Sequence, residues 1–119
     1  MNEIMIVDDE LAMVEVLREF LTPLGYRVGA ACNGNEALER IRRERPRVVL
    51  LDVRMPGMGG VEALLRIKEE MPEVAVIMLS AVHEDELARQ CMKMGASDYI
   101  TKPIDLGYLE RSIMATVCP

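Results

Sequence analysis

The stretch Val48-Val49-Leu50-Leu51-Asp52 is an unbroken apolar run that ends on an acid. A run without polar alternation is typical of a strand buried on both faces, as in a parallel sheet. Residues 4–7 and 74–79 form similar runs, whereas 26–31 and 97–101 are more polar and suit the two edges of a sheet. The runs begin about every 20 to 27 residues, which is the length of a strand plus a crossover helix.

Helical patterns separate these five expected strands. Asn33 with Glu36 is typical of a capping box, and Asp105 can cap a last helix. Apolar residues recur at helical spacing in five groups: Leu11, Val14, Leu17 and Leu21; Ala37, Leu38 and Ile41; Val61, Leu64 and Ile67; Leu87, Ala88 and Cys91; and Leu109, Ile113 and Val117. Alternating strands and helices predict a three-layer α/β fold with right-handed crossovers.

The composition is that of one globular domain. The chain has 119 residues, of which 50% are hydrophobic and 29% charged. The net charge of −6 makes nucleic acid a poor partner. The longest apolar run is too short to span a bilayer, and no basic segment precedes an apolar one at the start of the chain. We therefore expect a cytoplasmic protein that does not contact a membrane.

The cysteines and the histidine do not suggest chemistry of their own. Cys32, Cys91 and Cys118 form no CxxC pair, which argues against a zinc site and a disulfide framework. We expect each to pack as a small apolar residue. The single histidine, His83, lies in a polar stretch and is expected to be solvated.

The side chains that carry chemistry follow the strands. Ligands of open parallel sheets bind at the carboxyl ends of the strands. With strand order 2-1-3-4-5, four neighbouring strands would bring three carboxylates, a hydroxyl and an ammonium group to one rim: Asp8, Asp9, Asp52, Ser80 and Lys102. Three carboxylates at close range repel one another, so such a cluster indicates a bound cation. Oxygen ligands with room for water suit Mg²⁺ better than zinc.

A phosphoryl group fits the same rim. Lys102 and Ser80 could bind phosphoryl oxygens, and a carboxylate can itself attack phosphorus. Taken singly, each residue also has a simpler interpretation. Asp8 and Asp9 could cap a helix and begin its first turn, Asp52 and Ser80 could be turn residues, and Lys102 could be solvated. Their occurrence together, at the ends of strands that must be neighbours, favours a functional site.

Four segments at this rim resemble the receiver domains of two-component response regulators. They are Val7-Asp8-Asp9-Glu10, Leu51-Asp52-Val53-Arg54-Met55-Pro56-Gly57-Met58, Leu79-Ser80-Ala81 and Gly95-Ala96-Ser97-Asp98-Tyr99-Ile100-Thr101-Lys102-Pro103. The resemblance covers essentially the whole chain. It implies a flavodoxin-like (βα)5 fold of strand order 2-1-3-4-5. Residues 1–119 would form one receiver domain, with any effector domain absent or truncated.

The resemblance also implies roles for the acids. Asp52 would accept a phosphoryl group, with Mg²⁺ as the cofactor. Asp9 and Asp52 would bind the metal directly, Asp8 largely through water, and Arg54 through its backbone carbonyl.

Other expected roles lie on the fourth and fifth strands. Ser80 and Lys102 would hold phosphoryl oxygens, and the Lys102–Pro103 bond would be cis. Ser80 and Tyr99 would form the switch, with Tyr99 changing rotamer on activation.

The family implies partners as well. A sensor histidine kinase or phosphotransfer protein, or acetyl phosphate, would supply the phosphoryl group. The chain would be a signalling domain that catalyses only its own phosphoryl transfer and dephosphorylation. A partner or a second copy would bind the face of the fourth helix, fifth strand and fifth helix, which carries Glu84, Glu86, Arg89, Lys93 and Arg111.

One position departs from the family's pattern. Gly59 stands where the family commonly has Asp, Asn or Ser, and Gly60 follows it. Glycine caps helices weakly, so the third helix is expected to start late or fray, and Gly107 is a similar weak point in the fifth.

Two other functions compete with the signalling domain. A Mg²⁺-dependent phosphohydrolase would need a further acid or base and an enclosing cap. A flavin carrier would need a phosphate loop after the first strand, where Asp8 and Asp9 would repel a phosphate.

Overall fold

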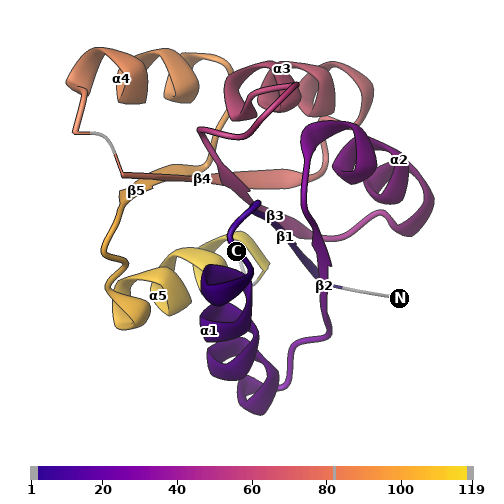
Figure 1. Ribbon diagram of the computed structural model, residues 1–119, viewed down its shortest axis with the longest axis vertical. Coiled ribbons are helices and arrows are strands. Elements are labelled where there is room, and N and C mark those ends of the chain that lie inside the picture. Colours follow the sequence, from indigo (N-terminus) through magenta and orange to yellow (C-terminus); the bar gives the residue numbers. More distant parts are fainter. Residues whose placement is uncertain (1–2, 82, 118–119) are drawn as a thin grey trace.

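The computed structural model describes residues 3–81 and 83–117. Within them, strands and helices alternate along the chain (Figure 1). The strands are β1 (Ile4–Val7), β2 (Val28–Ala31), β3 (Val48–Asp52), β4 (Ala75–Ser80) and β5 (Asp98–Thr101). The helices are α1 (Leu11–Leu21), α2 (Gly34–Glu44), α3 (Gly60–Glu70), α4 (Asp85–Lys93) and α5 (Leu106–Val117), with a short 3-10 helix, η1 (Thr22–Leu24), after α1.

The strands form one parallel sheet in the order β2-β1-β3-β4-β5. The predicted order and both predicted edges are confirmed. In register, Val7 lies beside Leu51, Leu51 beside Met78, and Met78 beside Tyr99. The carboxyl ends of β1, β3, β4 and β5 therefore meet at one rim.

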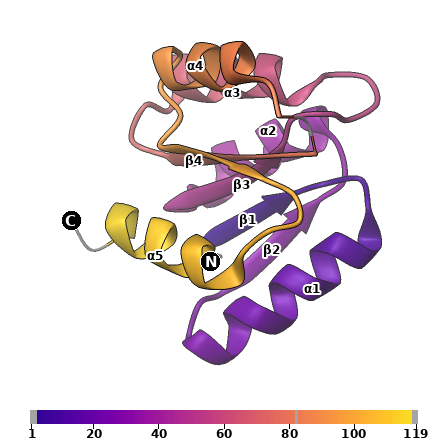
Figure 2. The ribbon, with the colours of Figure 1, turned by 90° about the vertical axis from the view of Figure 1, so that its left-hand side faces the viewer.

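Helices cover both faces of the sheet, which confirms the three-layer, flavodoxin-like fold. Helices α1 and α5 lie on one face, and α2, α3 and α4 lie on the other (Figures 1 and 2). Each face has its own hydrophobic core, because successive side chains of a strand point to opposite sides. The strand β3 contributes Val49 and Leu51 to one core and Val48 and Leu50 to the other, with none of the four exposed to solvent.

The helix ends follow local chemistry. The Asn33 side chain accepts a hydrogen bond from the Glu36 backbone N–H at 2.8 Å, as predicted. The Glu36 carboxylate accepts from the backbone N–H of Cys32, one residue before the position that a capping box predicts. Asp105 accepts from the Tyr108 N–H at 3.1 Å and so caps α5.

The expectation that α3 starts late is wrong. The helix begins at Gly60, directly after Gly59. The Gly60 N–H donates to the carbonyl of Val53 at 2.9 Å, and a Cβ at position 60 would lie 2.1 Å from the carbonyl oxygen of Asp52. Glycine is required here because the helix backbone lies directly against the end of β3.

The cysteine expectation holds for one residue and fails for another. Cys91 is fully buried in the core beneath α4, as predicted. Cys32 is exposed, because β2 is an edge strand and the chain leaves the sheet there. Cys118 lies outside the described residues. His83 is exposed, as expected.

Among the described residues, no helix has both the length and the apolar character needed to cross a membrane.

Candidate functional site

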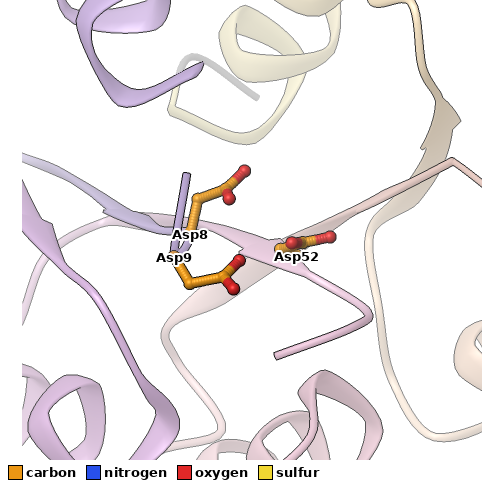
Figure 3. A group of neighbouring side chains, drawn as sticks. All are labelled: Asp8, Asp9 and Asp52. Carbon is orange, nitrogen blue, oxygen red and sulfur yellow. The ribbon is translucent and has the colours of Figure 1, made fainter. Parts of the chain in front are cut away.

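Three aspartates meet where β1 and β3 end. Asp8 and Asp9 follow β1 directly, and Asp52 is the last residue of β3, its neighbour in the sheet. One carboxylate oxygen of each lies within 4.8 Å of the others (Figure 3). Asp8 is 1% exposed and Asp52 6%, whereas Asp9 is exposed at the surface. The predicted carboxylate cluster is therefore present.

Asp8 is oriented by the backbone that follows it. Its carboxylate accepts a hydrogen bond from the Glu10 N–H at 2.9 Å, and its own N–H donates to the carbonyl of Ala31. The residue that caps α1 is Glu10, whose carbonyl accepts from the N–H groups of Met13 and Val14. The simpler interpretation of Asp8 as a helix cap is therefore wrong.

Lys102 reaches the cluster from the end of β5. Its backbone N–H donates to the carbonyl of Ser80 at 2.7 Å, which fixes the position of the residue. Its Nζ lies 3.3 Å from Asp8 Oδ2 and 3.6 Å from Asp52 Oδ1, and its side chain is 13% exposed. A solvated lysine would not be held in this way. The Lys102–Pro103 peptide bond is cis, as predicted.

One ammonium group does not offset the local negative charge. Burial, and then repulsion from Asp8, raise the pKa of Asp52 from 3.8 to about 6, against the opposing effect of Lys102 and a backbone hydrogen bond from Arg54. For Lys102, burial lowers the pKa, but the charges of Asp52 and Asp8 outweigh burial and raise it overall. The folded chain thus holds Asp52 in surroundings that disfavour its charged form.

These surroundings fit a hard divalent cation. All the donors are carboxylate oxygens, two of the three aspartates are buried, and their repulsion would be relieved by a positive charge between them. An open hollow of about 700 Å³ adjoins the cluster and is lined by Asp9, Cys32, Asn33, Asn35, Pro56, Gly57 and Met58. The cluster is therefore accessible to a small ion and its waters.

The other predicted residues lie around the cluster. Ser80 is the last residue of β4 and is 1% exposed. Arg54 follows Asp52 by two residues, bonds to its carboxylate through the backbone, and has an exposed side chain. Tyr99 is not at the rim itself: it lies on β5, partly buried against the core beneath α2, α3 and α4.

One residue of this group was not predicted from the sequence. Glu10 Oε1 lies 3.7 Å from Lys102 Nζ. The sequence shows that the acid Glu10 follows Asp8 and Asp9 directly. It does not show that Glu10 contacts Lys102, which is distant along the chain.

The chain belongs to the response regulator receiver domain family, whose model matches residues 4–114. Sporulation initiation phosphotransferase F of Bacillus subtilis is 36% identical over 114 residues, covering 95% of this chain and 92% of that protein. The chemotaxis protein CheY of Thermotoga maritima is 37% identical over 103 residues, covering 86% of each. A structure of CheY from Borrelia burgdorferi, in a complex with CheX, BeF3 and Mg²⁺, superposes with a TM-score of 0.92 at 30% identity, covering 98% of this chain and 89% of that one.

Some relatives are much longer than this chain. The chain spans 53% of the transcriptional regulatory protein CrdR of Helicobacter pylori and 25% of ZraR of Klebsiella oxytoca. The family predicted from the four segments is confirmed. Receiver domains are the signalling domains of two-component response regulators, in which an aspartate is phosphorylated.

Proposed function

We propose that this chain accepts a phosphoryl group on Asp52 and thereby switches a partner surface. The observation that carries the proposal is the placement of Asp52: a buried carboxylate at the end of a central strand, beside two other carboxylates and 3.6 Å from the Lys102 ammonium group. The whole chain, residues 1–119, acts as one receiver domain in the cytoplasm.

The reaction uses the Asp52 carboxylate as the nucleophile. One carboxylate oxygen forms a bond to phosphorus, and the bond from phosphorus to the donor's leaving atom breaks, with its electron pair departing on the leaving group. The product is an acyl phosphate. Lys102 and Ser80 then bind phosphoryl oxygens, and Lys102 exchanges a carboxylate partner for a phosphoryl one, so its charge stays neutralised.

The metal that fits the carboxylates is Mg²⁺. Asp9 and Asp52 would bind it directly, Asp8 would act largely through water, and the Arg54 backbone carbonyl would be a further ligand. Bound there, Mg²⁺ supplies positive charge that neutralises the carboxylates and the incoming phosphoryl oxygens. The chain's own contribution is to hold the carboxylates in place, through the Glu10 N–H on Asp8 and the strand β3 beneath Asp52.

The phosphodonor is a sensor histidine kinase or a phosphotransfer protein, and acetyl phosphate can substitute for it. The chain catalyses only its own phosphorylation and dephosphorylation, and no other substrate is turned over. The accessible rim beside Asp9 supports the approach of a donor group.

The output is carried by Ser80 and Tyr99. Ser80 and Thr101 lie side by side in the register of β4 and β5, so a movement of Ser80 toward a phosphoryl group reaches the strand that carries Tyr99. The face of α4, β5 and α5 receives the change and binds a partner or a second copy. Its mixed charges, including the exposed Arg89–Glu86 pair at 3.4 Å, support a polar contact.

Intact-mass measurement after incubation with acetyl phosphate and Mg²⁺ tests the phosphoacceptor. We expect one added phosphoryl group on the unmodified chain and none on Asp52→Asn. Asp85→Asn is the matched control, because it removes the same charge at the exposed start of α4. Equal labelling of Asp52→Asn and the control would refute the proposal.

Amide chemical shifts with and without beryllofluoride and Mg²⁺ test the switch. We expect shifts at Tyr99 and along the α4–β5–α5 face, and their loss in Ser80→Ala. Shifts confined to the rim around Asp52 in the unmodified chain would contradict the switch and leave phosphorylation intact.

A further inference from the structure

Glu10 directly follows the two aspartates at the end of β1, and its backbone is held by hydrogen bonds. Its N–H donates to Asp8 at 2.9 Å, and its carbonyl accepts the first backbone hydrogen bonds of α1 from Met13 and Val14. Its backbone is thus tied to the carboxylate cluster on one side and to a helix on the other. Its side chain is 67% exposed and ends 3.7 Å from Lys102 Nζ.

Glu10 is the outermost of three carboxylates around Lys102. Asp8 and Asp52 contact the ammonium group from the buried side, at 3.3 and 3.6 Å, and their side chains are 0% and 8% exposed. Glu10 contacts it from the solvent side. A phosphoryl group that binds Lys102 must therefore compete with the Glu10 carboxylate for the ammonium group.

We propose that Glu10 is a specificity-determining residue that selects phosphodonors by charge. Its carboxylate disfavours donors that carry more net negative charge, and it releases Lys102 only when a phosphoryl oxygen takes its place. The inference rests on the proposed phosphorylation of Asp52, and it concerns the rate and donor preference of that reaction.

The effect is expected in rates and not in stability. An exposed ion pair contributes little to the free energy of folding, because water screens it and both side chains lose freedom. A charge close to a binding site nevertheless changes the local potential that an incoming ion meets, and this effect falls with salt. Stability and phosphorylation rate should therefore respond differently to the loss of Glu10.

Two small donors that differ in net charge provide the test. Acetyl phosphate is a dianion at pH 7, and its P–O bond breaks with the electron pair leaving on acetate. Phosphoramidate is a monoanion at that pH, with its nitrogen already protonated. When its P–N bond breaks, the electron pair stays on the nitrogen, which leaves as ammonia. In both reactions the new bond joins phosphorus to an Asp52 oxygen, so only the donor's charge and leaving group differ.

The test measures the phosphorylation rate of Glu10→Gln with each donor, in excess Mg²⁺, at low and high ionic strength. Glu69→Gln is the control, because it removes the same charge from an exposed position near the end of α3, far from the rim. We expect Glu10→Gln to raise the rate with acetyl phosphate about fivefold at low salt and the rate with phosphoramidate about twofold, with both gains shrinking in high salt. The control should match the unmodified chain, and the melting temperatures of all three should agree.

Three results would overturn the proposal. They are unchanged rates with both donors, a fall in rate with either donor, and an equal rise with both donors that salt does not reduce. In each of these cases Asp52 is still phosphorylated, so the proposed function stands. Absence of phosphorylation from the unmodified chain would instead overturn the proposed function.

Discussion

Asp52 and Asp98 are two aspartates in the same sheet with opposite surroundings. Asp52 ends β3 and faces two other carboxylates, with the Lys102 Nζ 3.6 Å away. Asp98 begins β5, and its carboxylate accepts three hydrogen bonds: from the Tyr99 N–H at 2.8 Å, the Tyr108 hydroxyl at 2.9 Å and the Ser112 hydroxyl at 2.8 Å.

The difference separates a carboxylate whose charge the fold disfavours from one whose charge the fold satisfies. The hydrogen-bond donors to Asp98 all lie within the chain, and those from α5 join that helix to β5. The carboxylate therefore needs no bound ion or ligand to satisfy it. Asp52 is held where its charge is disfavoured, and a cation or a phosphoryl group would complete its surroundings. The contrast predicts that removing the two charges changes stability in opposite directions.

The largest expected effect is that of Asp52→Asn on the metal-free protein. The pKa of Asp52 is about 6 in the folded chain and 3.8 without the fold, so the folded state binds the proton more tightly. Stability from this group is present below about pH 4 and is lost as the pH rises through 6. Asp52→Asn should therefore be more stable than the unmodified chain by about 3 kcal/mol at pH 8 and about equally stable near pH 4.

Urea unfolding across this pH range, with a chelator present, measures the difference. A gain that does not vary with pH would show that the variant acts through packing. If Asp52→Asn were less stable than the unmodified chain at pH 8, the expected difference between Asp52 and Asp98 would be contradicted.

The second effect is stabilisation by Mg²⁺. At a hundredfold excess over its dissociation constant the ion should raise the free energy of unfolding by about 2.7 kcal/mol. Asp9→Asn should weaken this response, because it removes one of the three carboxylates of the cluster. Asp98→Ala should keep the response unchanged. Calorimetric melting with and without Mg²⁺ is the measurement, and a melting temperature indifferent to the ion would contradict a metal site.

The third effect is the loss of stability in Asp98→Ala. Removing this carboxylate leaves the hydroxyls of Tyr108 and Ser112 without their acceptor, at an expected cost of about 2 kcal/mol. Tyr108→Phe removes one of these hydrogen bonds and should cost about half as much. Urea unfolding at pH 7 compares the two. An Asp98→Ala variant as stable as the unmodified chain would show that Asp98 does not hold α5 to β5.

The smallest effect concerns Gly59→Ser beside the rim. Gly59 has an ordinary extended conformation (φ −73°, ψ 166°), and a Cβ there would have only the Val53 carbonyl oxygen, at 3.9 Å, within 4 Å. A serine hydroxyl can cap α3 and should add about 0.5 kcal/mol, equally at pH 4 and pH 8. Gly59→Ala, which lacks the hydroxyl, separates capping from the loss of glycine's flexibility. A gain that varies with pH would link the cap to the charge of Asp52.

The fold was predictable because its strands are apolar runs of the right length. Runs such as 48–51 can only be buried on both faces, and the capping residues Asn33 and Asp105 marked helix starts. The strand ends then determined which acids meet, so Asp8, Asp9, Asp52 and Lys102 were found by position along the chain.

The features that were missed depend on contacts between distant segments. Gly60 looks like a weak helix start in the sequence, but the carbonyl oxygen of Asp52 leaves no space for a side chain there. The contact of Glu10 with Lys102 and the two hydrogen bonds from α5 to Asp98 likewise join separate elements. A pattern within one helix or strand carries no information about such approaches.

The most direct test of the central claim locates the phosphoryl group chemically. The chain is treated with acetyl phosphate and Mg²⁺, the acyl phosphate is reduced with borohydride to homoserine, and peptides are analysed by mass spectrometry. We predict homoserine at position 52, with positions 8, 9 and 98 remaining aspartate. Homoserine at position 8 or 9 in place of 52, or aspartate at all four positions, would contradict it.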